Sequence, residues 1–395
     1  ALKLGKMIIV VDDEDRETDG DFVMCADMIT PAAVNFMATH GRGMICAPLT
    51  PEKAEILNLP LQVGTNTAPL GTAFTVTIDA IDKVTTGISS ADRAHSLKLI
   101  ANPNAKASEF SRPGHIFPLI ARPGGVLKRP GHTEAAVDLA RMAGFEPVGV
   151  ICEIMNADGT MSRRDDLENI AETHNLKMIS IADLILYRKM NENLISMVES
   201  VPLNTQHGEF TLYVFRSEIL GQEHNAILKG DPLKLSQSSP LLRIHSECFT
   251  GDVLGSTRCD CGAQLEQALS AIEAEGSGMV VYMRQEGRGI GLMNKVRAYN
   301  LQDQGLDTVD ANLQLGFPAD AREYTMAAQI LKHFNISKAR LLTNNPTKLA
   351  AMKNLGVTEL IREAIETNPH AANMHYLQTK KTKLGHWLGH TLLNQ

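Results

Sequence analysis

The chain has 395 residues, of which 44% are hydrophobic, and a formal net charge of −7. This length suggests two domains, and the hydrophobic content is sufficient for two cores. The acidic balance argues against broad nonspecific nucleic-acid binding, and no apolar run approaches the roughly 20 residues of a membrane span.

Six cysteines in a chain this long do not make a disulfide framework, so we expect metal binding in a reducing compartment. The chain shows no secretion signal before its first expected strand, which favours a cytoplasmic enzyme. Ala1 stands where an initiator Met is usual and suggests a processed or truncated start.

A short apolar run at residues 7–11 predicts a buried strand, and an acidic segment at residues 12–21 follows it directly. Carboxylates at this density repel one another unless a cation lies among them, and Mg²⁺ prefers such oxygen ligands. A solvated acidic turn is the alternative. Next, Thr30 and Pro31 predict the start of a capped helix at residues 30–40, and residues 72–79 alternate like a strand.

Two loops then share the pattern Pro-Gly-His. The first, at residues 112–118, holds His115, and the second, at 129–135, holds His132 and opens a helix expected to end at Gly144. A helix N-terminus preceded by Arg and Gly suits a phosphate. The strand expected at 148–154 contains Glu153, a carboxylate that is costly in an apolar run unless it is paired or functional. Each feature alone is more often structural, but together they indicate a site.

These segments carry a resemblance to a known family. Asp-Glu-Asp-Arg-Glu before Gly20-Asp21, Arg-Pro-Gly-His ending at His115, Gly-His-Thr-Glu-Ala from Gly131 and Ile-Cys-Glu-Ile from Ile151 resemble 3,4-dihydroxy-2-butanone 4-phosphate synthase, over roughly residues 1–190. The resemblance implies that ribulose 5-phosphate is converted to formate and a four-carbon phosphate with Mg²⁺ or Mn²⁺.

The same resemblance implies roles for single residues. Glu17 and His132 would be the metal ligands, and His115 and Glu153 the catalytic residues. The residues that would contact ribulose 5-phosphate are Arg16, Glu17, Asp21, Arg129, Pro130, Gly131, His132, Thr133 and Glu153.

A short segment containing Pro202, at residues 198–205, is expected to be a linker, and strand alternation restarts at 208–215. We therefore predict two domains, at residues 1–199 and 200–395. The halves share no motif, which indicates a fusion of two unrelated domains.

The second half holds three thiols, Cys248, Cys259 and Cys261, spaced Cys-x10-Cys-x-Cys. Three thiolates leave one position open on a tetrahedral zinc ion, as catalytic zinc sites do. From the spacing alone, a structural zinc finger with a distant fourth ligand and three unrelated thiols remain open. A helix is expected at 262–276, and the strand at 279–283 leads into a segment rich in Gly and Arg at 284–291, where the backbone can approach an anion closely.

Two later segments also suit an anion. Residues 319–324, which include Asp320 and Arg322, are expected to begin a helix. The strand at 340–343 leads into Asn-Asn-Pro-Thr-Lys, ending at Lys348, which opens another helix.

In this order, Arg-Ile-His-Ser-Glu-Cys, Arg-Cys-Asp-Cys-Gly, Arg-Gln-Glu-Gly-Arg-Gly-Ile-Gly-Leu, Gln-Leu-Gly-Phe-Pro-Ala-Asp-Ala-Arg and Leu-Leu-Thr-Asn-Asn-Pro resemble GTP cyclohydrolase II, over roughly residues 206–385. The resemblance implies Zn²⁺ on the three cysteines and Mg²⁺ on the pyrophosphate of GTP. Asp320 would be the proton acceptor, and Arg322 would attack the α-phosphate or stabilise that step.

The same resemblance implies that Tyr299 falls at a position linked to this site. The implied GTP contacts are Arg243, Ile244, His245, Ser246, Glu247, Gln264, Glu286, Gly287, Arg288, Thr308, Thr343 and Lys348. The chain end at 382–395 matches the family loosely, and its His386 and His390 are expected at the surface.

Together the two halves indicate a bifunctional riboflavin-biosynthesis enzyme, a lyase joined to a hydrolase. We expect an α+β N-terminal domain with a mixed sheet and a separate α/β C-terminal domain. The substrates would be small molecules, with no nucleic-acid or membrane partner, and a homodimer is the family expectation. One alternative leaves one half silent as a dimerising scaffold. Another is a zinc-stabilised nucleic-acid-binding module, which needs a fourth zinc ligand and a basic domain.

Overall fold

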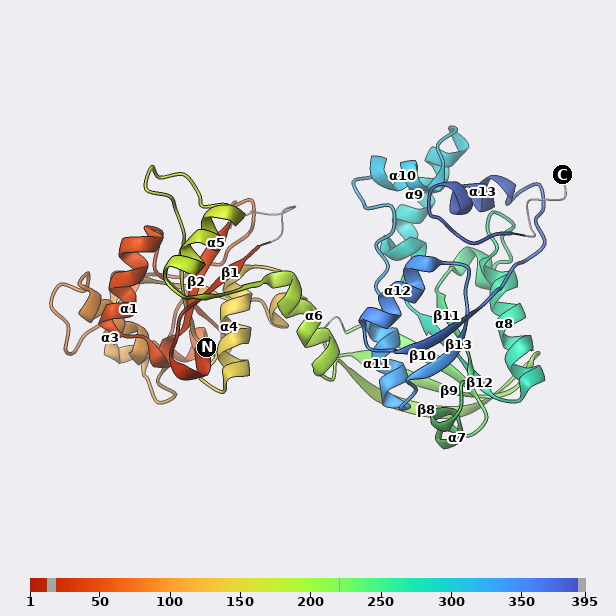
Figure 1. The fold of residues 1–395 in the computed structure, drawn as a ribbon, viewed down its shortest axis with the longest axis horizontal. Coiled ribbons are helices and arrows are strands. Elements are labelled where there is room, and N and C mark those ends of the chain that lie inside the picture. The colour runs from red at the N-terminus through yellow and green to blue at the C-terminus, as the bar shows by residue number, and fades with distance from the viewer. Residues whose placement is uncertain (13–18, 220, 390–395) are drawn as a thin grey trace. The chain divides into compact units, whose positions relative to one another are not determined.

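The computed structural model describes residues 1–12, 19–219 and 221–389 (Figure 1). Contacts within the chain divide it into two compact units, Ala1–Arg188 and Lys189–Gln395. Each unit is built around its own seven-stranded sheet.

None of the helices in the described part of the chain is both long enough and apolar enough to span a membrane.

The sheet of the first unit has the order β4-β5-β3-β6-β2-β1-β7 and mixes parallel and antiparallel pairs. Its strands are β1 (Ile8–Val11), β2 (Gly20–Cys25), β3 (Cys46–Leu49), β4 (Ile78–Ala80), β5 (Phe110–Ile120), β6 (Gly149–Glu153) and β7 (Lys177–Ser180). The helices are α1 (Pro31–Phe36), α2 (Pro51–Ile56), α3 (Ser90–Ala101), α4 (His132–Ala143), α5 (Arg164–Thr173) and α6 (Ile181–Asn191).

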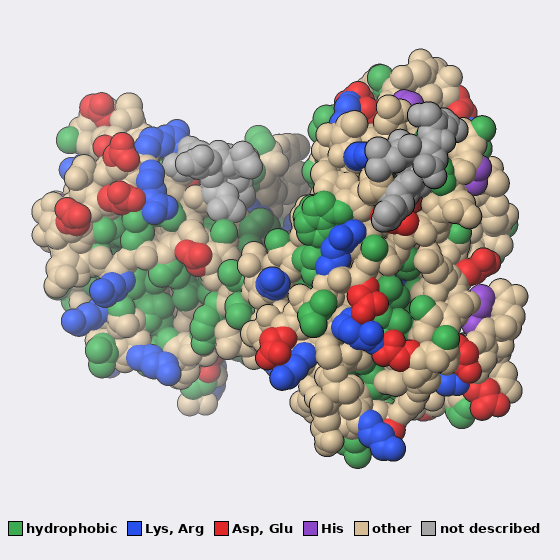
Figure 2. Space-filling view, turned by 45° about the vertical axis from the view of Figure 1, so that its right-hand side comes forward, with side chains coloured by type: hydrophobic (Ala, Val, Ile, Leu, Met, Phe, Trp, Pro, Cys, Tyr) green, Lys and Arg blue, Asp and Glu red, His purple; other side chains and the backbone are tan. Residues whose placement is uncertain are grey.

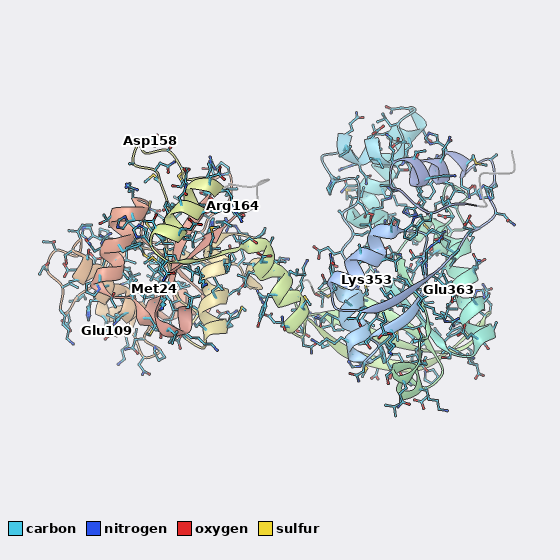
Figure 3. All side chains as sticks on the ribbon, in the orientation of Figure 1. Met24, Glu109, Asp158, Arg164, Lys353 and Glu363 are labelled. Carbon is cyan, nitrogen blue, oxygen red and sulfur yellow. The ribbon has the colours of Figure 1, made fainter. Side chains whose placement is uncertain are left out.

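Both faces of this sheet are buried, which explains why the strand at residues 7–11 is apolar throughout. Ile9 and Val11 face a core shared with α1, α3 and α5, whereas Ile8 and Val10 face a core shared with α4 and α6. Met24 lies inside this unit and is 3% exposed, while the charged Asp158 and Arg164 lie at its surface (Figure 3).

The sheet of the second unit has the order β14-β13-β11-β12-β10-β9-β8. Strands β11 to β14 are mutually parallel, and β8 to β10 add an antiparallel part. The strands are β8 (Ile195–Thr205), β9 (Gly208–Ser217), β10 (Glu223–Lys229), β11 (Leu241–Ser246), β12 (Gly278–Met283), β13 (Lys338–Leu342) and β14 (Glu359–Glu363).

The helices of the second unit are α7 (Pro232–Gln237), α8 (Cys261–Glu275), α9 (Gly291–Asp303), α10 (Thr308–Gln314), α11 (Thr325–His333), α12 (Pro346–Asn354) and α13 (Met374–Thr382). Side chains of α11 and α12 pack into one core, and those of α8 pack into the other. The predicted fold classes, α+β with a mixed sheet and then α/β, are confirmed.

Three expectations about elements are wrong. The strand expected at 72–79 is limited to β4 at its end, preceded only by isolated bridges at Phe74 and Thr75. The expected linker at 198–205 belongs to β8, which pairs with β9 along its length; β8 is an edge strand that is exposed almost throughout, so its sequence shows no alternation. The predicted domain boundary at 199/200 falls inside this strand. The helix expected to begin at 319–324 begins at Thr325, and the preceding residues form a loop.

Charged side chains of both signs are interspersed on the face of the molecule that Figure 2 shows, and no continuous basic surface covers it.

Two candidate active sites

The first candidate site lies where β1 ends and β2 begins. Asp12 follows β1, Asp19 precedes β2, and His132 is the first residue of α4. One ligand atom from each of these three residues lies within 4.8 Å of the others. Two carboxylates and an imidazole at this spacing can hold a divalent cation. Asp19 Oδ1 is buried and has no hydrogen-bond partner among the described residues, which suits a metal ligand.

Two more carboxylates face the same place. Asp21 on β2 is 3% exposed and lies directly opposite Glu153 on β6 in the antiparallel register. His132 Nδ1 is 3.9 Å from Asp21 Oδ1, and Glu153 Oε2 accepts a hydrogen bond of 2.8 Å from the backbone N–H of Met44. Three of the residues assigned from the sequence, Asp21, His132 and Glu153, therefore come together.

The surroundings of His132 indicate its tautomer. Its Nε2 lies 3.2 Å from the carbonyl oxygen of Val10, which can only accept a hydrogen bond. Nε2 therefore carries the proton, and Nδ1, on the side of the carboxylates, has the lone pair that a metal needs.

His115 on β5 is paired with Asp79 on β4. His115 Nδ1 is 2.6 Å from Asp79 Oδ2, and the backbone N–H of His115 donates to Asp79 Oδ1 at 2.9 Å. Two bonds to one carboxylate fix both the ring and its backbone. Because the His115 side chain is still 43% exposed, it can reach a ligand.

The loop before α4 is held by an ion pair. Arg129 Nη1 donates to Glu134 Oε2 at 2.7 Å, and Glu134 is 1% exposed. Pro130, Gly131 and Thr133 surround the helix N-terminus, where backbone N–H groups suit a phosphate. Arg16 and Glu17 lie outside the described residues.

The second candidate site is a pocket at the carboxyl ends of the parallel strands β11, β12 and β13, the usual place for ligands in open α/β sheets. Its lining includes all three cysteines and Tyr299, and also Arg243, His245, Ser246, Glu247, Gln264, Glu286, Gly287, Arg288, Thr308, Arg322, Thr343 and Lys348. These are all the residues assigned to this half except Ile244 and Asp320.

Ile244 and Asp320 do not line the pocket, but each contacts a residue that does. The Ile244 side chain is 0% exposed and belongs to the core, while its carbonyl oxygen accepts a hydrogen bond of 2.8 Å from Lys348 Nζ. Asp320 forms a two-pronged ion pair with Arg322, at 2.8 Å through Nε and 2.5 Å through Nη2. The pair converges because both residues precede α11 instead of lying on it.

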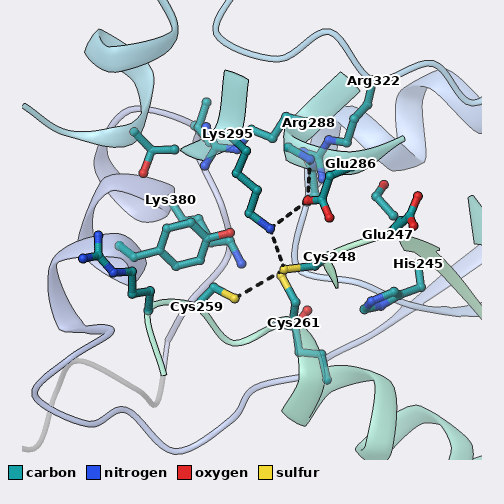
Figure 4. A pocket seen from close by; sticks show the side chains of 18 of the residues that line it. His245, Glu247, Cys248, Cys259, Cys261, Glu286, Arg288, Lys295, Arg322 and Lys380 are labelled. Carbon is teal, nitrogen blue, oxygen red and sulfur yellow. Dashed lines mark hydrogen bonds and ion pairs between the residues drawn. The ribbon is translucent and has the colours of Figure 1, made fainter. Parts of the chain in front are cut away.

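The three thiols converge in the pocket (Figure 4). Cys248 follows β11, Cys259 lies in the next loop and Cys261 begins α8; their sulfur atoms lie within 4.8 Å of one another. In the described part of the chain no fourth His, Cys, Asp or Glu joins this cluster. A Cβ on Gly251 would lie 2.9 Å from Cys259 Sγ and 3.0 Å from Cys248 Sγ, so only glycine leaves room for this cluster.

A buried lysine stands beside the thiols. Lys295 Nζ lies 3.1 Å from Cys248 Sγ and 2.7 Å from Glu286 Oε1 (Figure 4). Glu286 Oε2 accepts a hydrogen bond of 2.6 Å from the backbone N–H of Phe249. The Cys259 and Cys261 thiols, together with Lys295, hold the pKa of Cys248 well below its usual range. A thiolate is the form that binds a metal.

The rest of the pocket attracts anions. Among the described residues, seven Lys or Arg side chains but only two carboxylates line it. Arg243 is 6% exposed and its buried Nε has no hydrogen-bond partner in the described structure; the same is true of both terminal nitrogens of Arg288. Donors left unpaired in this way are costly unless a ligand accepts from them.

Arg288 is also held in an unusual backbone conformation. Its φ is 60°, and Gly287 before it has φ 62°, so two consecutive residues adopt the left-handed region. Glycine accepts this freely and arginine does not, which is the kind of local strain that accumulates at binding sites.

The sequence reasoning missed several residues of these sites. Asp12 and Asp19 belong to the acidic run, but no spacing rule singles them out. Asp79 stood at the end of an expected strand without a visible partner. Lys295 lies on a helix that was not singled out. His386, expected at the surface, is half-buried and lines the pocket, and burial lowers its pKa to about 3. His390 lies outside the described residues.

Comparisons with known proteins agree with this arrangement. The family model of 3,4-dihydroxy-2-butanone 4-phosphate synthase matches residues 1–187, and that of GTP cyclohydrolase II matches residues 196–364. The riboflavin biosynthesis protein RibBA of Bacillus mycoides is 53% identical over 388 residues, which are 98% of this chain and 97% of that protein. RibBA of Synechocystis sp. is also 53% identical, over 98% of this chain and 70% of that protein.

One solved structure is similar over both units. It is RibBX from A. baumannii, described as a two-domain 3,4-dihydroxy-2-butanone 4-phosphate synthase, with 36% identity and a TM-score of 0.68; the match covers 92% of this chain and 97% of that one. With relatives this similar over nearly its whole length, the chain belongs to the RibBA family of bifunctional riboflavin-biosynthesis enzymes, in which a 3,4-dihydroxy-2-butanone 4-phosphate synthase domain precedes a GTP cyclohydrolase II domain.

Proposed function

We propose that the first unit converts D-ribulose 5-phosphate to 3,4-dihydroxy-2-butanone 4-phosphate and formate. The second unit hydrolyses GTP to 2,5-diamino-6-(ribosylamino)pyrimidin-4-one 5'-phosphate, formate and pyrophosphate. The observation that carries this proposal is that each unit holds its own metal-ligand cluster, one of oxygen and imidazole ligands and one of thiols.

In the first unit, Glu17 and His132 bind Mg²⁺ or Mn²⁺, with Asp12 and Asp19 close enough to take part. Such an ion stabilises charge on neighbouring substrate oxygens when bound. Glu153 and Asp21, opposite each other, can each accept a proton from the sugar carbon that is enolised. His115, oriented by Asp79, exchanges a proton with a substrate hydroxyl.

The phosphate of this substrate is held by the loop that opens α4. The backbone N–H of Thr133, in the first turn of α4, and the guanidinium of Arg129 provide a donor and positive charge there. Arg129 keeps its position through Glu134, so its binding to phosphate does not depend on ordering a flexible side chain. Arg16, Asp21 and Pro130 complete the proposed contacts.

In the second unit, Cys248, Cys259 and Cys261 bind zinc. The donor set fits, since three thiols converge without a fourth ligand in the described structure, which leaves one position for substrate or water. Bound zinc activates water near neutral pH for hydrolysis of the imidazole ring of guanine. A structural zinc finger would need a fourth ligand, and none of the residues that the structure describes supplies one.

The triphosphate lies against the cationic side of the pocket. Arg243 and Arg288 supply charge and unpaired donors for the phosphates, and Lys348 lies beside them in the pocket, with Mg²⁺ on the pyrophosphate. Burial would lower the pKa of Arg322, but Tyr324 and the Asp320 carboxylate outweigh it and raise that pKa. A guanidinium that keeps its proton is a weak nucleophile, so Arg322 stabilises charge at the α-phosphate and Asp320 accepts the proton.

The proposal includes a cytoplasmic homodimer. Six free cysteines in the described structure are consistent with a reducing compartment. Multi-angle light scattering of the purified chain tests the dimer directly, with twice the mass of the single chain as the expected result.

The test of both activities uses the whole chain. Formate is measured in separate assays with GTP and with ribulose 5-phosphate, each supplied with zinc and Mg²⁺, and pyrophosphate is measured in the GTP assay. Both substrates should yield formate, and only GTP should yield pyrophosphate. Formate from one substrate alone would mean that the other unit is a silent scaffold, and no formate from either would refute both assignments.

A further inference from the structure

The end of the chain forms one wall of the second pocket. The C-terminal segment, residues 374–388, contains α13 and lies beyond residue 364, where the match to the cyclohydrolase family ends. Its residues that line the pocket are Tyr376, Lys380, Leu384 and His386. Lys380 is only 9% exposed, so this segment is packed into the unit.

Lys380 makes a buried ion pair. Its Nζ lies 2.6 Å from Asp260 Oδ1, and the two side chains are 11% and 1% exposed. Asp260 stands between the two thiol residues Cys259 and Cys261. Burying two opposite charges costs solvation that their attraction offsets only with good geometry and further hydrogen bonds, so such a pair is weak evidence for a stabilising role. The side chains that the ion pair holds in place therefore say more about its role than its contribution to stability does.

Asp260 links Lys380 to two pocket residues through a chain of hydrogen bonds. Its Oδ2 accepts a hydrogen bond of 2.7 Å from Gln264 Nε2, and Gln264 Oε1 accepts one of 2.7 Å from Arg243 Nη2. The carboxylate can only accept, so it determines which end of the Gln264 amide faces Arg243. Both Gln264 and Arg243 line the pocket.

The segment is fixed at further points. Lys383 Nζ lies 2.5 Å from Asp307 and 2.7 Å from Asp310, at the start of α10, which carries Thr308. The backbone N–H of Trp387 donates to the carbonyl of Asn344 at 2.8 Å, and the Arg362 guanidinium lies 4.9 Å from the centre of the Trp387 ring. These contacts hold the Lys380 ammonium in one place.

We infer that Lys380 is a positioning residue of the nucleotide site, which acts through Asp260 to orient the Gln264 amide and, with it, the Arg243 guanidinium. The inference rests on the proposed GTP reaction of the second unit. Without the ammonium, the Asp260 carboxylate is free to turn, and the Gln264 amide keeps only its long hydrogen bond of 3.4 Å to the Ile365 carbonyl as a fixed contact on that side. The substrate must then order both groups on binding. The Lys380→Met variant should therefore raise KM for GTP by about tenfold and change kcat much less.

The experiment compares four changes in the full chain. Lys380→Met removes the ammonium, Lys380→Arg keeps a cation, and Gln264→Ala removes the amide through which Lys380 acts. Lys381→Met is the matched control, because that neighbouring side chain is exposed. KM and kcat for GTP, zinc content and formate from ribulose 5-phosphate are measured for each; the last of these reports on the integrity of the chain.

A double-mutant cycle tests the route of the effect. If Lys380 acts through Gln264, Lys380→Met should raise KM much less when Gln264→Ala is already present. Because Lys380→Met leaves Asp260 buried without its partner, Lys380→Met is also combined with Asp260→Asn. The combined variant removes both charges, and it should show the same rise in KM for GTP as Lys380→Met, with normal zinc content.

The possible results distinguish a failure of the Lys380 inference from a failure of the proposed GTP reaction. If wild type releases formate from GTP and Lys380→Met behaves like Lys381→Met, the inference is wrong and the proposed function stands. Two other outcomes would show a structural role instead. One is that the effects of Lys380→Met and Gln264→Ala on KM are additive. The other is that both Lys380→Met and its combination with Asp260→Asn lose zinc or a folded second unit. If wild type releases no formate from GTP, both fail together.

Discussion

The two candidate sites differ in their metal ligands and in the direction of the strands that carry them. Carboxylates and an imidazole gather in the first unit, and thiols gather in the second. In the first unit β1, β2 and β6 run alternately, so the end of β1, the start of β2 and the end of β6 meet at one edge and bring Asp12, Asp21 and Glu153 together. In the second unit the carboxyl ends of parallel strands meet, and loops from distant parts of the sequence supply thiols and cations. Sheet topology therefore decides which sequence motifs can share a site.

The largest expected difference between the sites is in metal dependence. Removing zinc with a thiol-preferring chelator, with Mg²⁺ in excess, should lower formate release from GTP by roughly three orders of magnitude or more, because a metal ion contributes several kcal/mol to such a step. Formate release from ribulose 5-phosphate should persist, since oxygen ligands prefer Mg²⁺. Added zinc should restore the GTP reaction. An equal fall of both reactions would contradict the separation of the two sites.

The next prediction concerns the first unit alone. Asp79→Asn should lower the rate with ribulose 5-phosphate on the order of 10² to 10⁴-fold, because the carboxylate fixes the orientation and tautomer of His115. The GTP reaction should be unchanged. Asp82→Asn, at an exposed position nearby, is the control. Steady-state rates that are the same for the two variants would remove Asp79 from the site.

A third prediction concerns the second unit alone. Lys295→Met leaves Glu286 buried without its cation and takes the donor from Cys248, so the free energy of unfolding of this unit should fall by roughly 3 kcal/mol. Zinc content and the GTP rate should fall with it. Denaturant unfolding measures the first effect, with the exposed Lys353→Met as control. An unfolding free energy like that of the control would mean that the lysine is not needed for this packing.

The smallest expected effect is on acid stability. Burial, and then the nearby Arg284, lower the pKa of His224 from 6.5 to about 4. Between these values the unfolded chain binds a proton that the folded unit does not, so stability falls as pH decreases from 6.5 towards 4. His224→Gln should flatten this part of the curve, measured by thermal unfolding at several pH values. An unchanged slope in the variant would show that other groups cause the acid sensitivity.

Much of the fold could be predicted from the sequence because local signals and burial agree. Thr30 and Pro31 predicted the start of α1, and Thr30 Oγ1 does accept the hydrogen bond from Ala33. Gly144 and Gly276 end α4 and α8 in the left-handed conformation. The linker expected before residue 206 was wrong, because an exposed strand at a sheet edge carries no pattern of alternating burial.

The sites were predictable where the residue type itself limits the chemistry. The thiols of Cys248, Cys259 and Cys261 have few uses at that spacing, and they do converge. Pairings across long sequence distances were not predictable: Asp79 with His115 depends on the β4–β5 register, and Lys380 with Asp260 depends on where the last helix docks. An isolated aspartate or lysine gives no sign of its partner in the sequence.

The central claim is that one chain carries two independent active sites, and a crossed pair of variants tests it most directly. Formate release from GTP and from ribulose 5-phosphate is measured for wild type, Cys259→Ser and His132→Ala. The account predicts that Cys259→Ser abolishes only the GTP reaction and His132→Ala only the sugar-phosphate reaction. If either folded variant loses both reactions, or keeps the one assigned to its own unit, the two-site account is contradicted.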